Sequence, residues 1–95
     1  MAGVPTQVTQ EELGRRLKMV RSYRGLTLGD VERLTHSAIT KSTLSGYERG
    51  ERWPELSKLR VLADLYQVDM GALLSAEYDW ATRAWPKLEH ATVAA

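Results

Sequence analysis

Apolar residues recur along the chain at intervals of three and four positions, a spacing that places them on one face of an α-helix. No segment shows the two-residue alternation that is typical of a half-buried β-strand. The pattern therefore predicts an all-α protein, a compact bundle of about five helices. The expected helical segments are residues 9–24, 27–34, 40–49, 54–66 and 69–74.

The first two segments begin and end at recognisable signals. Thr9 and Glu12 have the spacing of a capping box, and Gly25 suits the left-handed residue that follows a helix. Thr27 is a second N-cap candidate, with Asp30 three residues further on. The residues that these segments are expected to bury are Leu13, Leu17, Val20, Leu28, Val31 and Leu34.

The later segments carry similar signals. Thr40 is the expected N-cap of the third helix, and Gly50 is expected to end it. Pro54 suits the first turn of the fourth helix, where a backbone N–H is not needed, and Asp69 suits the N-cap of a short fifth helix. The expected buried positions are Leu44, Tyr47, Leu56, Leu59, Leu62, Ala63, Tyr66, Leu73 and Leu74.

Residues 39–54, ITKSTLSGYERGERWP, combine helical spacing with many small hydroxyl side chains. Two short helices and a connection over residues 27–50 form the layout of a helix-turn-helix motif, whose second helix enters the DNA major groove. Serine, threonine and lysine can all form hydrogen bonds with base edges. The positions expected on the face opposite Leu44 and Tyr47 are Lys41, Ser42, Ser45 and Gly46.

Gly46 is unexpected inside a helix, because glycine there costs about 1 kcal/mol relative to alanine. One explanation is that the missing side chain lets the helix backbone approach DNA closely. The other is that the position is simply exposed and tolerant. The positive end of the same helix is expected to favour a phosphate near Thr40.

The net charge of +1 conceals an asymmetry along the chain. Residues 1–63 carry eleven basic and seven acidic side chains, whereas residues 64–95 carry two basic and five acidic ones. This distribution favours a basic working face in the first part and another role for the second. Arg16, in the basic first helix, is a candidate for a phosphate contact, although a run of charges more often marks a solvated face.

Composition argues against several classes of function. The chain has no cysteine and only two histidines, so we expect no disulfide, no metal site and no other cofactor. No spacing places a nucleophile beside a base, so we expect no enzyme activity. Without a membrane-spanning run or a signal-peptide pattern, the expected location is the cytoplasm, in association with the nucleoid.

Two blocks, LGRRLKMVRSYRGLTLGDVERL and ITKSTLSGYERGERWPELSKLRVLADLYQVDMGALL, resemble the Cro/C1-type (XRE-like) helix-turn-helix regulators over about two thirds of the chain. The specific part is the pattern S-x-x-E-R-G-x-R-x-P followed by L-x-x-L-A-x-x-Y-x-V. The spacing is especially similar to that of the DNA-binding domains of BldD-type actinomycete regulators. This resemblance implies a bundle of about five helices that binds operator DNA as a homodimer.

The resemblance also implies roles for individual residues. The recognition helix would run from Thr40 to Arg49. Arg21 and Glu48 match an ion pair that ties the first helix to the recognition helix, and Arg49 and Arg52 match positions that meet phosphates. The residues expected at DNA are Thr27, Thr40, Lys41, Ser42, Thr43, Ser45, Gly46, Arg49 and Arg52, together with Arg16.

The connection THSAIT, residues 35–40, departs from the family pattern. The usual connection is about two residues shorter and contains a glycine. The extra residues could change the angle of the recognition helix or bring His36 or Ser37 to the DNA backbone. BldD-type regulators also lengthen this region, so the departure is a variation within the resemblance.

The ends of the chain are expected to lie outside the motif. Residues 1–8 would form an N-terminal arm, residues 9–75 the DNA-binding domain and residues 76–95 a C-terminal extension with a helix over residues 77–85. Aromatic residues of the extension could pack on the bundle, form a dimer contact or bind a protein partner. These residues are Tyr78, Trp80 and Trp85.

Two functional hypotheses follow. The first is a transcriptional regulator, expected to be a repressor, that binds double-stranded DNA sequence-specifically as a homodimer on a palindromic operator. The second is a protein-interaction module, such as an antitoxin, an anti-repressor or a polymerase-contacting factor, whose aromatic extension binds a protein partner. Deletion of residues 76–95 would separate them, because a lost co-purifying protein with intact DNA binding would favour the second.

Overall fold

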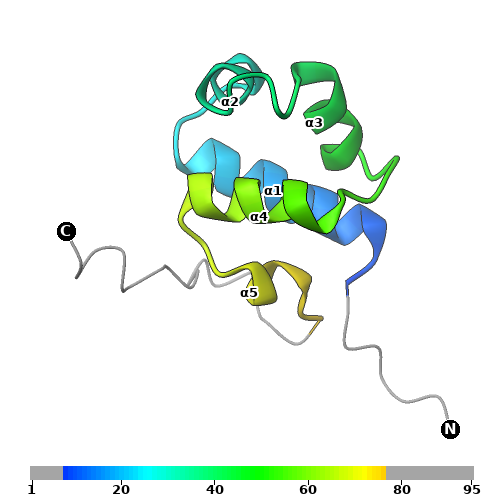
Figure 1. Ribbon diagram of the computed structural model, residues 1–95. Helices are drawn as coiled ribbons and strands as arrows, with labels where there is room; N and C mark the ends of the chain where they lie inside the picture. Colours follow the sequence, from blue (N-terminus) through cyan, green and yellow to red (C-terminus); the bar gives the residue numbers. More distant parts are fainter. Residues whose placement is uncertain (1–7, 77–95) are drawn as a thin grey trace, which may run out of the picture.

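The computed structural model describes residues 8–76, which contain five α-helices and no β-strand. The helices are α1 (Gln10–Tyr23), α2 (Leu28–Leu34), α3 (Lys41–Glu48), α4 (Leu56–Tyr66) and α5 (Met70–Leu74). α2 and α3 lie at one end of the bundle and α5 at the other, with α1 and α4 between them (Figure 1). The predicted all-α fold is confirmed. The helix predicted over residues 77–85 lies outside the described residues.

The predicted N-caps account for the starts of four helices. At each, a side-chain oxygen accepts a hydrogen bond from a backbone N–H three residues on; the capping residues are Thr9, Thr27, Thr40 and Asp69. The capping box at Thr27 is complete, because the Asp30 carboxylate accepts a hydrogen bond from the Thr27 N–H. At Thr9 only half of the predicted box forms, because the Glu12 carboxylate pairs with Arg16 instead.

Glycines end two helices as predicted, but the fourth helix starts later than expected. Gly25 and Gly50 follow α1 and α3 with φ angles of +75° and +74°, a conformation that glycine adopts without strain. The prediction that Pro54 lies in the first turn of the fourth helix is wrong. Glu55 keeps an extended backbone (φ −63°, ψ 153°) and is the N-cap of α4, so Pro54 precedes the helix.

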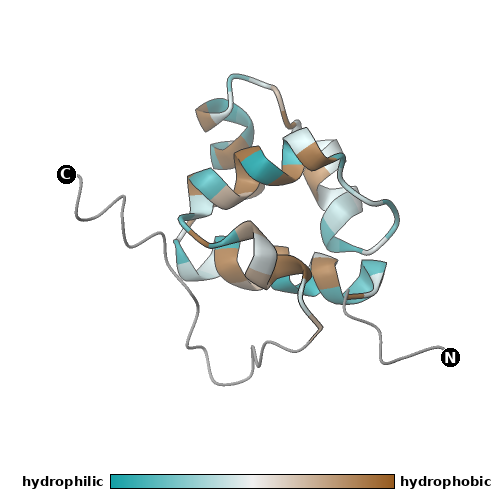
Figure 2. Ribbon diagram, turned by 60° about the horizontal axis from the view of Figure 1, so that its bottom comes forward, coloured by the Kyte–Doolittle hydropathy of each residue, from teal (hydrophilic) through white to brown (hydrophobic). Residues whose placement is uncertain are grey.

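One hydrophobic core joins the helices, each of which contributes buried apolar residues (Figure 2). Leu34 and Leu56, which were expected in this core, are 42% and 64% exposed. Leu34 is the last residue of α2 and Leu56 the first of α4, so both lie at helix ends beyond the core. Helical periodicity also missed core residues that lie outside the helices: Val8, Ile39 and Val68.

Val8 therefore belongs to the domain and not to the predicted arm. Its side chain is 6% exposed, and its N–H donates a hydrogen bond to the Leu74 carbonyl at 2.9 Å. This bond joins the start of the described chain to the end of α5. The remaining arm positions, residues 1–7, lie outside the described residues.

α1 and α3 approach each other backbone to backbone. A Cβ atom added to Gly14 would lie 2.4 Å from the Tyr47 carbonyl oxygen and 2.7 Å from that of Glu48. One added to Gly50 would lie 2.9 Å from Cα of Glu11. No side chain larger than hydrogen fits at either position without a shift of backbone. The two glycines therefore set how closely α3 packs on α1.

The connection between α2 and α3 contains no glycine but still uses the left-handed region. His36 and Ser37 have φ angles of +54° and +65°, which are uncommon for residues with a side chain. The loop is held at its ends, because Ile39 is fully buried and its N–H donates to the Thr35 hydroxyl at 3.3 Å. That hydroxyl in turn donates to the Val31 carbonyl at 2.8 Å.

Candidate nucleic-acid interface

α3 has an inner face against the bundle and an outer face toward solvent. Leu44 is fully buried and Tyr47 is 5% exposed, whereas Lys41 and Ser42 are exposed and Thr43 and Ser45 are half-buried. The predicted separation into an inward apolar face and an outward polar face is confirmed for these residues. The outer face is therefore accessible to a large ligand such as double-stranded DNA.

An ion pair anchors the C-terminal end of α3 to α1. Nε and Nη2 of Arg21 lie 2.7 and 2.9 Å from the two carboxylate oxygens of Glu48. The side chains are only 12% and 6% exposed, and the hydrogen bonds with Glu48 raise the pKa of Arg21. The ion pair expected from the family resemblance is present. Glu48 faces α1 and does not present a carboxylate to the outer face.

The N-terminal end of α3 is held by a carboxylate from α2. Oε1 of Glu32 accepts a hydrogen bond from the Lys41 N–H at 2.7 Å. The negative charge is stabilised at this position by the positive end of the helix. A phosphate was expected to occupy the same end near Thr40, but in this structure the chain's own carboxylate accepts the hydrogen bond there. Sequence reasoning missed Glu32, because only the fold brings α2 to this point.

Arg49, expected at phosphate, is exposed but engaged in hydrogen bonds. Its Nε and Nη2 each donate to the Glu51 carboxylate at 2.9 Å, and its Nη1 donates to the Ser45 hydroxyl. These bonds with Arg49 lower the pKa of Glu51. The guanidinium is thus oriented along the outer face, and the carboxylate offsets much of its positive charge.

Gly46 does not lie open on the outer face, because the side chain of Arg52 covers it. A Cβ atom added to Gly46 would lie 3.4 Å from Nε of Arg52 and 3.7 Å from its Cδ. The glycine is buried in consequence, although its neighbours Ser42 and Ser45 are not. The explanation that Gly46 is simply exposed is therefore wrong, and close approach to DNA stays a prediction. The position provides room for an arginine.

The prediction that Arg16 contacts phosphate is also wrong. Arg16 is 3% exposed, and its Nη1 lies 3.0 Å from the Ala72 carbonyl oxygen, 3.1 Å from that of Leu73 and 2.7 Å from that of Ser75. A buried cation at the C-terminal end of α5 satisfies carbonyl groups that have no partner within the helix. Arg16 therefore stabilises the bundle and is not available to DNA.

The remaining predicted site residues lie in two places. Thr27 and Thr40 are exposed at the starts of α2 and α3, where their hydroxyls accept the capping hydrogen bonds. The aromatic residues of the extension, Tyr78, Trp80 and Trp85, lie outside the described residues. Their role in dimer or partner contacts stays a prediction.

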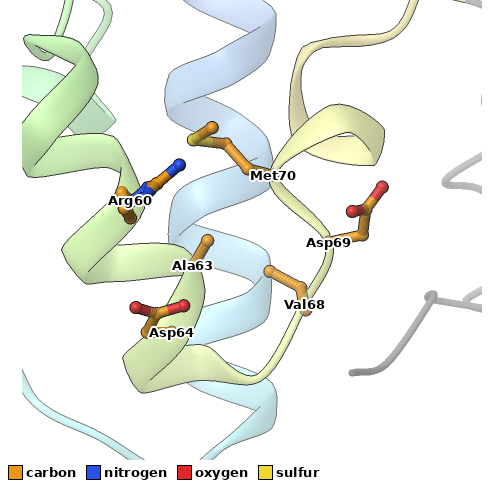
Figure 3. Close-up of a pocket in the computed structure, with 6 residues that line it drawn as sticks. All are labelled: Arg60, Ala63, Asp64, Val68, Asp69 and Met70. Atoms are coloured by element: carbon orange, nitrogen blue, oxygen red, sulfur yellow. The ribbon is translucent and has the colours of Figure 1, made fainter. Parts of the chain in front are cut away.

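A separate pocket of about 300 Å³ opens between α4 and α5 (Figure 3). Its lining residues are Arg60, Ala63, Asp64, Val68, Asp69 and Met70. None of them belongs to α2 or α3, so the pocket is not part of the outer face. Within residues 8–76 no group of three or more histidines and carboxylates could hold a metal ion, and no helix is long and apolar enough to cross a membrane.

Comparisons with known proteins point to the same region of the chain. A family model described as a helix-turn-helix domain matches residues 12–76. Two solved structures, of the DNA-binding domain of BldD and of the S. venezulae BldD DNA-binding domain, are each 34% identical to this chain with a TM-score of 0.63. The matches cover 68% of this chain and 92% and 94% of those chains. No curated protein matches the sequence.

Proposed function

Because the chain belongs to the helix-turn-helix domain family, we propose that it is a transcriptional regulator that reads double-stranded DNA with the outer face of α3 in the major groove. One observation carries the proposal. The inner face of α3 is locked to α1 by buried contacts, and this leaves Lys41 and Ser42 exposed on the first turn of the helix. In this motif, that turn is the part that reaches base edges.

The exposed side chains divide into two groups by chemistry. Lys41 can donate to guanine O6 and N7, and hydroxyl side chains can donate to or accept from several base edges. The hydroxyl residues concerned are Ser42, Thr43 and Ser45. Arg49, at the C-terminal edge of α3, is proposed to meet the phosphate backbone, with Thr27 and Thr40 at the starts of the two motif helices.

The family resemblance supports a homodimer on a palindromic operator, at which the protein would act as a repressor. Two recognition helices related by a twofold axis would lie about 34 Å apart, so that the half-sites are one helical turn apart. Phosphate contacts from both subunits would make the affinity fall steeply with salt. Such a regulator would act in the cytoplasm, in association with the nucleoid.

Selection of duplexes from a random library by the 95-residue chain at physiological salt tests this function. We expect one sequence to be enriched and to contain two related half-sites. Lys41→Ala should lower the preference for that sequence over random DNA by about tenfold, because a base contact is lost. Arg49→Ala should weaken binding to both duplexes by similar factors.

Arg60→Ala is the control, because Arg60 is an exposed cation that lines the α4–α5 pocket and does not lie on α3. It should leave the preference between the selected and random duplexes unchanged. A wild-type chain that enriches no sequence would contradict the proposed function. A Lys41→Ala variant with unchanged preference would show that the first turn of α3 does not read bases.

A further inference from the structure

Two arginines, Arg49 and Arg52, lie at the C-terminal edge of α3, and their guanidinium groups are held differently. The one on Arg49 donates hydrogen bonds to Glu51 and Ser45. The one on Arg52 forms no hydrogen bond within residues 8–76, although its charge contributes to the lowered pKa of nearby Glu51. The terminal N–H donors of this guanidinium are therefore available to a ligand.

The stem of Arg52 crosses the outer face of α3 at Gly46. A Cβ atom at Gly46 would lie 3.4, 3.7 and 3.8 Å from Nε, Cδ and Cγ of Arg52. At about 100° per residue, Gly46 is turned about 200° from the buried Leu44, so the arginine lies on the side of the helix away from the core. The glycine lowers helix propensity and leaves this space free.

We propose that Arg52 is a specificity-determining residue that donates two parallel hydrogen bonds to O6 and N7 of a guanine, and that Gly46 provides its seat on the recognition helix. The inference rests on the proposed DNA-binding function and changes the role that the family resemblance implied for Arg52. A seated stem restricts the side chain before binding, so less conformational freedom is lost when the contact forms.

The position of the guanidinium distinguishes this role from a phosphate contact. Phosphates flank the groove, whereas base edges lie at its floor, opposite the outer face of an inserted helix. Nε of Arg52 lies directly above that face at Gly46. Arg49 lies beside it and donates hydrogen bonds to Glu51, whereas Arg52 interacts with that carboxylate only through its charge and keeps its donors for a base.

The first experiment uses the full chain and the duplex that the wild-type chain selects. Each guanine of one half-site is replaced in turn, and the affinities of wild type, Arg52→Lys and Arg52→Ala are measured by fluorescence anisotropy. At one guanine we expect the replacement to weaken wild type by about tenfold. The same replacement should have little effect on either variant, because lysine keeps the charge but lacks the planar fork.

The second experiment tests the seat. In Gly46→Ala the added methyl group makes ordinary contact with Arg52, so the guanine preference should be kept. Gly46→Val brings two further methyl groups that compete for the volume of the arginine stem, so the preference should fall as in Arg52→Ala. Gly46→Val combined with Arg52→Ala should show no further loss. Thermal unfolding of every variant checks the fold.

Each other outcome has a definite meaning. If Arg52→Ala weakens the selected and random duplexes equally and lowers the salt slope by about one, Arg52 is a phosphate contact and the inference is overturned. If the losses from Gly46→Val and Arg52→Ala multiply, the two residues act separately and the seat is overturned. A wild-type chain that selects no duplex overturns the proposed function itself, and this inference with it.

Discussion

The two ends of α3 are attached to the bundle by different kinds of contact. At the C-terminal end, the Arg21–Glu48 ion pair is buried and Gly14 brings the backbones of α1 and α3 together. At the N-terminal end, the Lys41 N–H donates an exposed hydrogen bond to Glu32, and the buried residue Ile39 precedes the helix. Buried contacts between rigid backbones fix a position closely, whereas exposed polar contacts contribute little free energy.

The two ends also differ in their surroundings. The C-terminal end of α3 cannot move without disturbing the core. The N-terminal end is joined to the α2–α3 connection, in which His36 and Ser37 adopt left-handed backbone conformations. Lys58, on α4, also contacts this connection: its Nζ donates an exposed hydrogen bond to the Ala38 carbonyl at 2.9 Å.

Loss of the buried ion pair should have the largest effect on stability. Arg21→Leu leaves the Glu48 carboxylate buried without its partner and should lower the free energy of unfolding by about 3 kcal/mol. Urea unfolding followed by circular dichroism measures this change. The double variant Arg21→Leu/Glu48→Leu should recover most of the loss, because no unpaired charge remains. A double variant as unstable as the single one would assign the effect to packing.

Gly14→Ala should be the next most destabilising change. The new Cβ would meet two backbone carbonyl groups of α3, which cannot rotate away, and the expected cost is about 2 kcal/mol. Gly29→Ala is the matched control, since its Cβ would meet only side-chain atoms at 3.7 Å or beyond and should change stability by less than about 1 kcal/mol. Equal effects at the two glycines would remove the distinction between the two ends of α3.

A third variant concerns Tyr66 on α4, which lies near the Arg21–Glu48 ion pair at the C-terminal end of α3. Its hydroxyl is buried without a hydrogen-bond partner among the described residues, so Tyr66→Phe should raise stability by about 1 kcal/mol. Burial also raises the pKa of Tyr66, because the folded state disfavours the phenolate, so the free energy of unfolding is unaffected by this group below about pH 10 and falls as pH rises further. Thermal unfolding between pH 8 and about 11 should show a smaller alkaline loss for the phenylalanine variant. A destabilised variant would reveal a partner for the hydroxyl.

The smallest change is expected at the exposed end. Glu32→Gln keeps a hydrogen-bond acceptor near the Lys41 N–H but removes a negative charge from the positive end of α3. The expected cost is about 0.5 kcal/mol, and it should shrink as salt is added. Urea unfolding at low and high salt checks both points. A loss as large as that of Arg21→Leu would mean that the two ends are held equally firmly.

Local signals were sufficient to predict most of the helices. Threonine and aspartate caps, glycine stops and apolar spacing act over a few residues, and Thr9, Thr27, Thr40 and Asp69 all cap as expected. The same signals failed at Pro54, where the next residue stays extended, and they could not identify Val8 or Ile39, which reach the core from outside any helix. Gly14, a glycine inside a helix, could have indicated the close approach of another backbone, but the sequence analysis considered this explanation only for Gly46.

The candidate site was predictable only in part, because local signals do not show which distant residues a side chain contacts. Helical spacing alone places Lys41 and Ser42 opposite Leu44, because that arrangement depends on one helix. The position of Arg16 depends on carbonyl groups of α5, far away in the sequence, whereas Arg52 folds back over Gly46, six residues before it. The sequence by itself determined the capped helices and the two faces of α3, because these depend on residues a few positions apart. Only the tertiary structure decided that Arg16 is buried, because its carbonyl partners lie on a segment that is distant in the sequence.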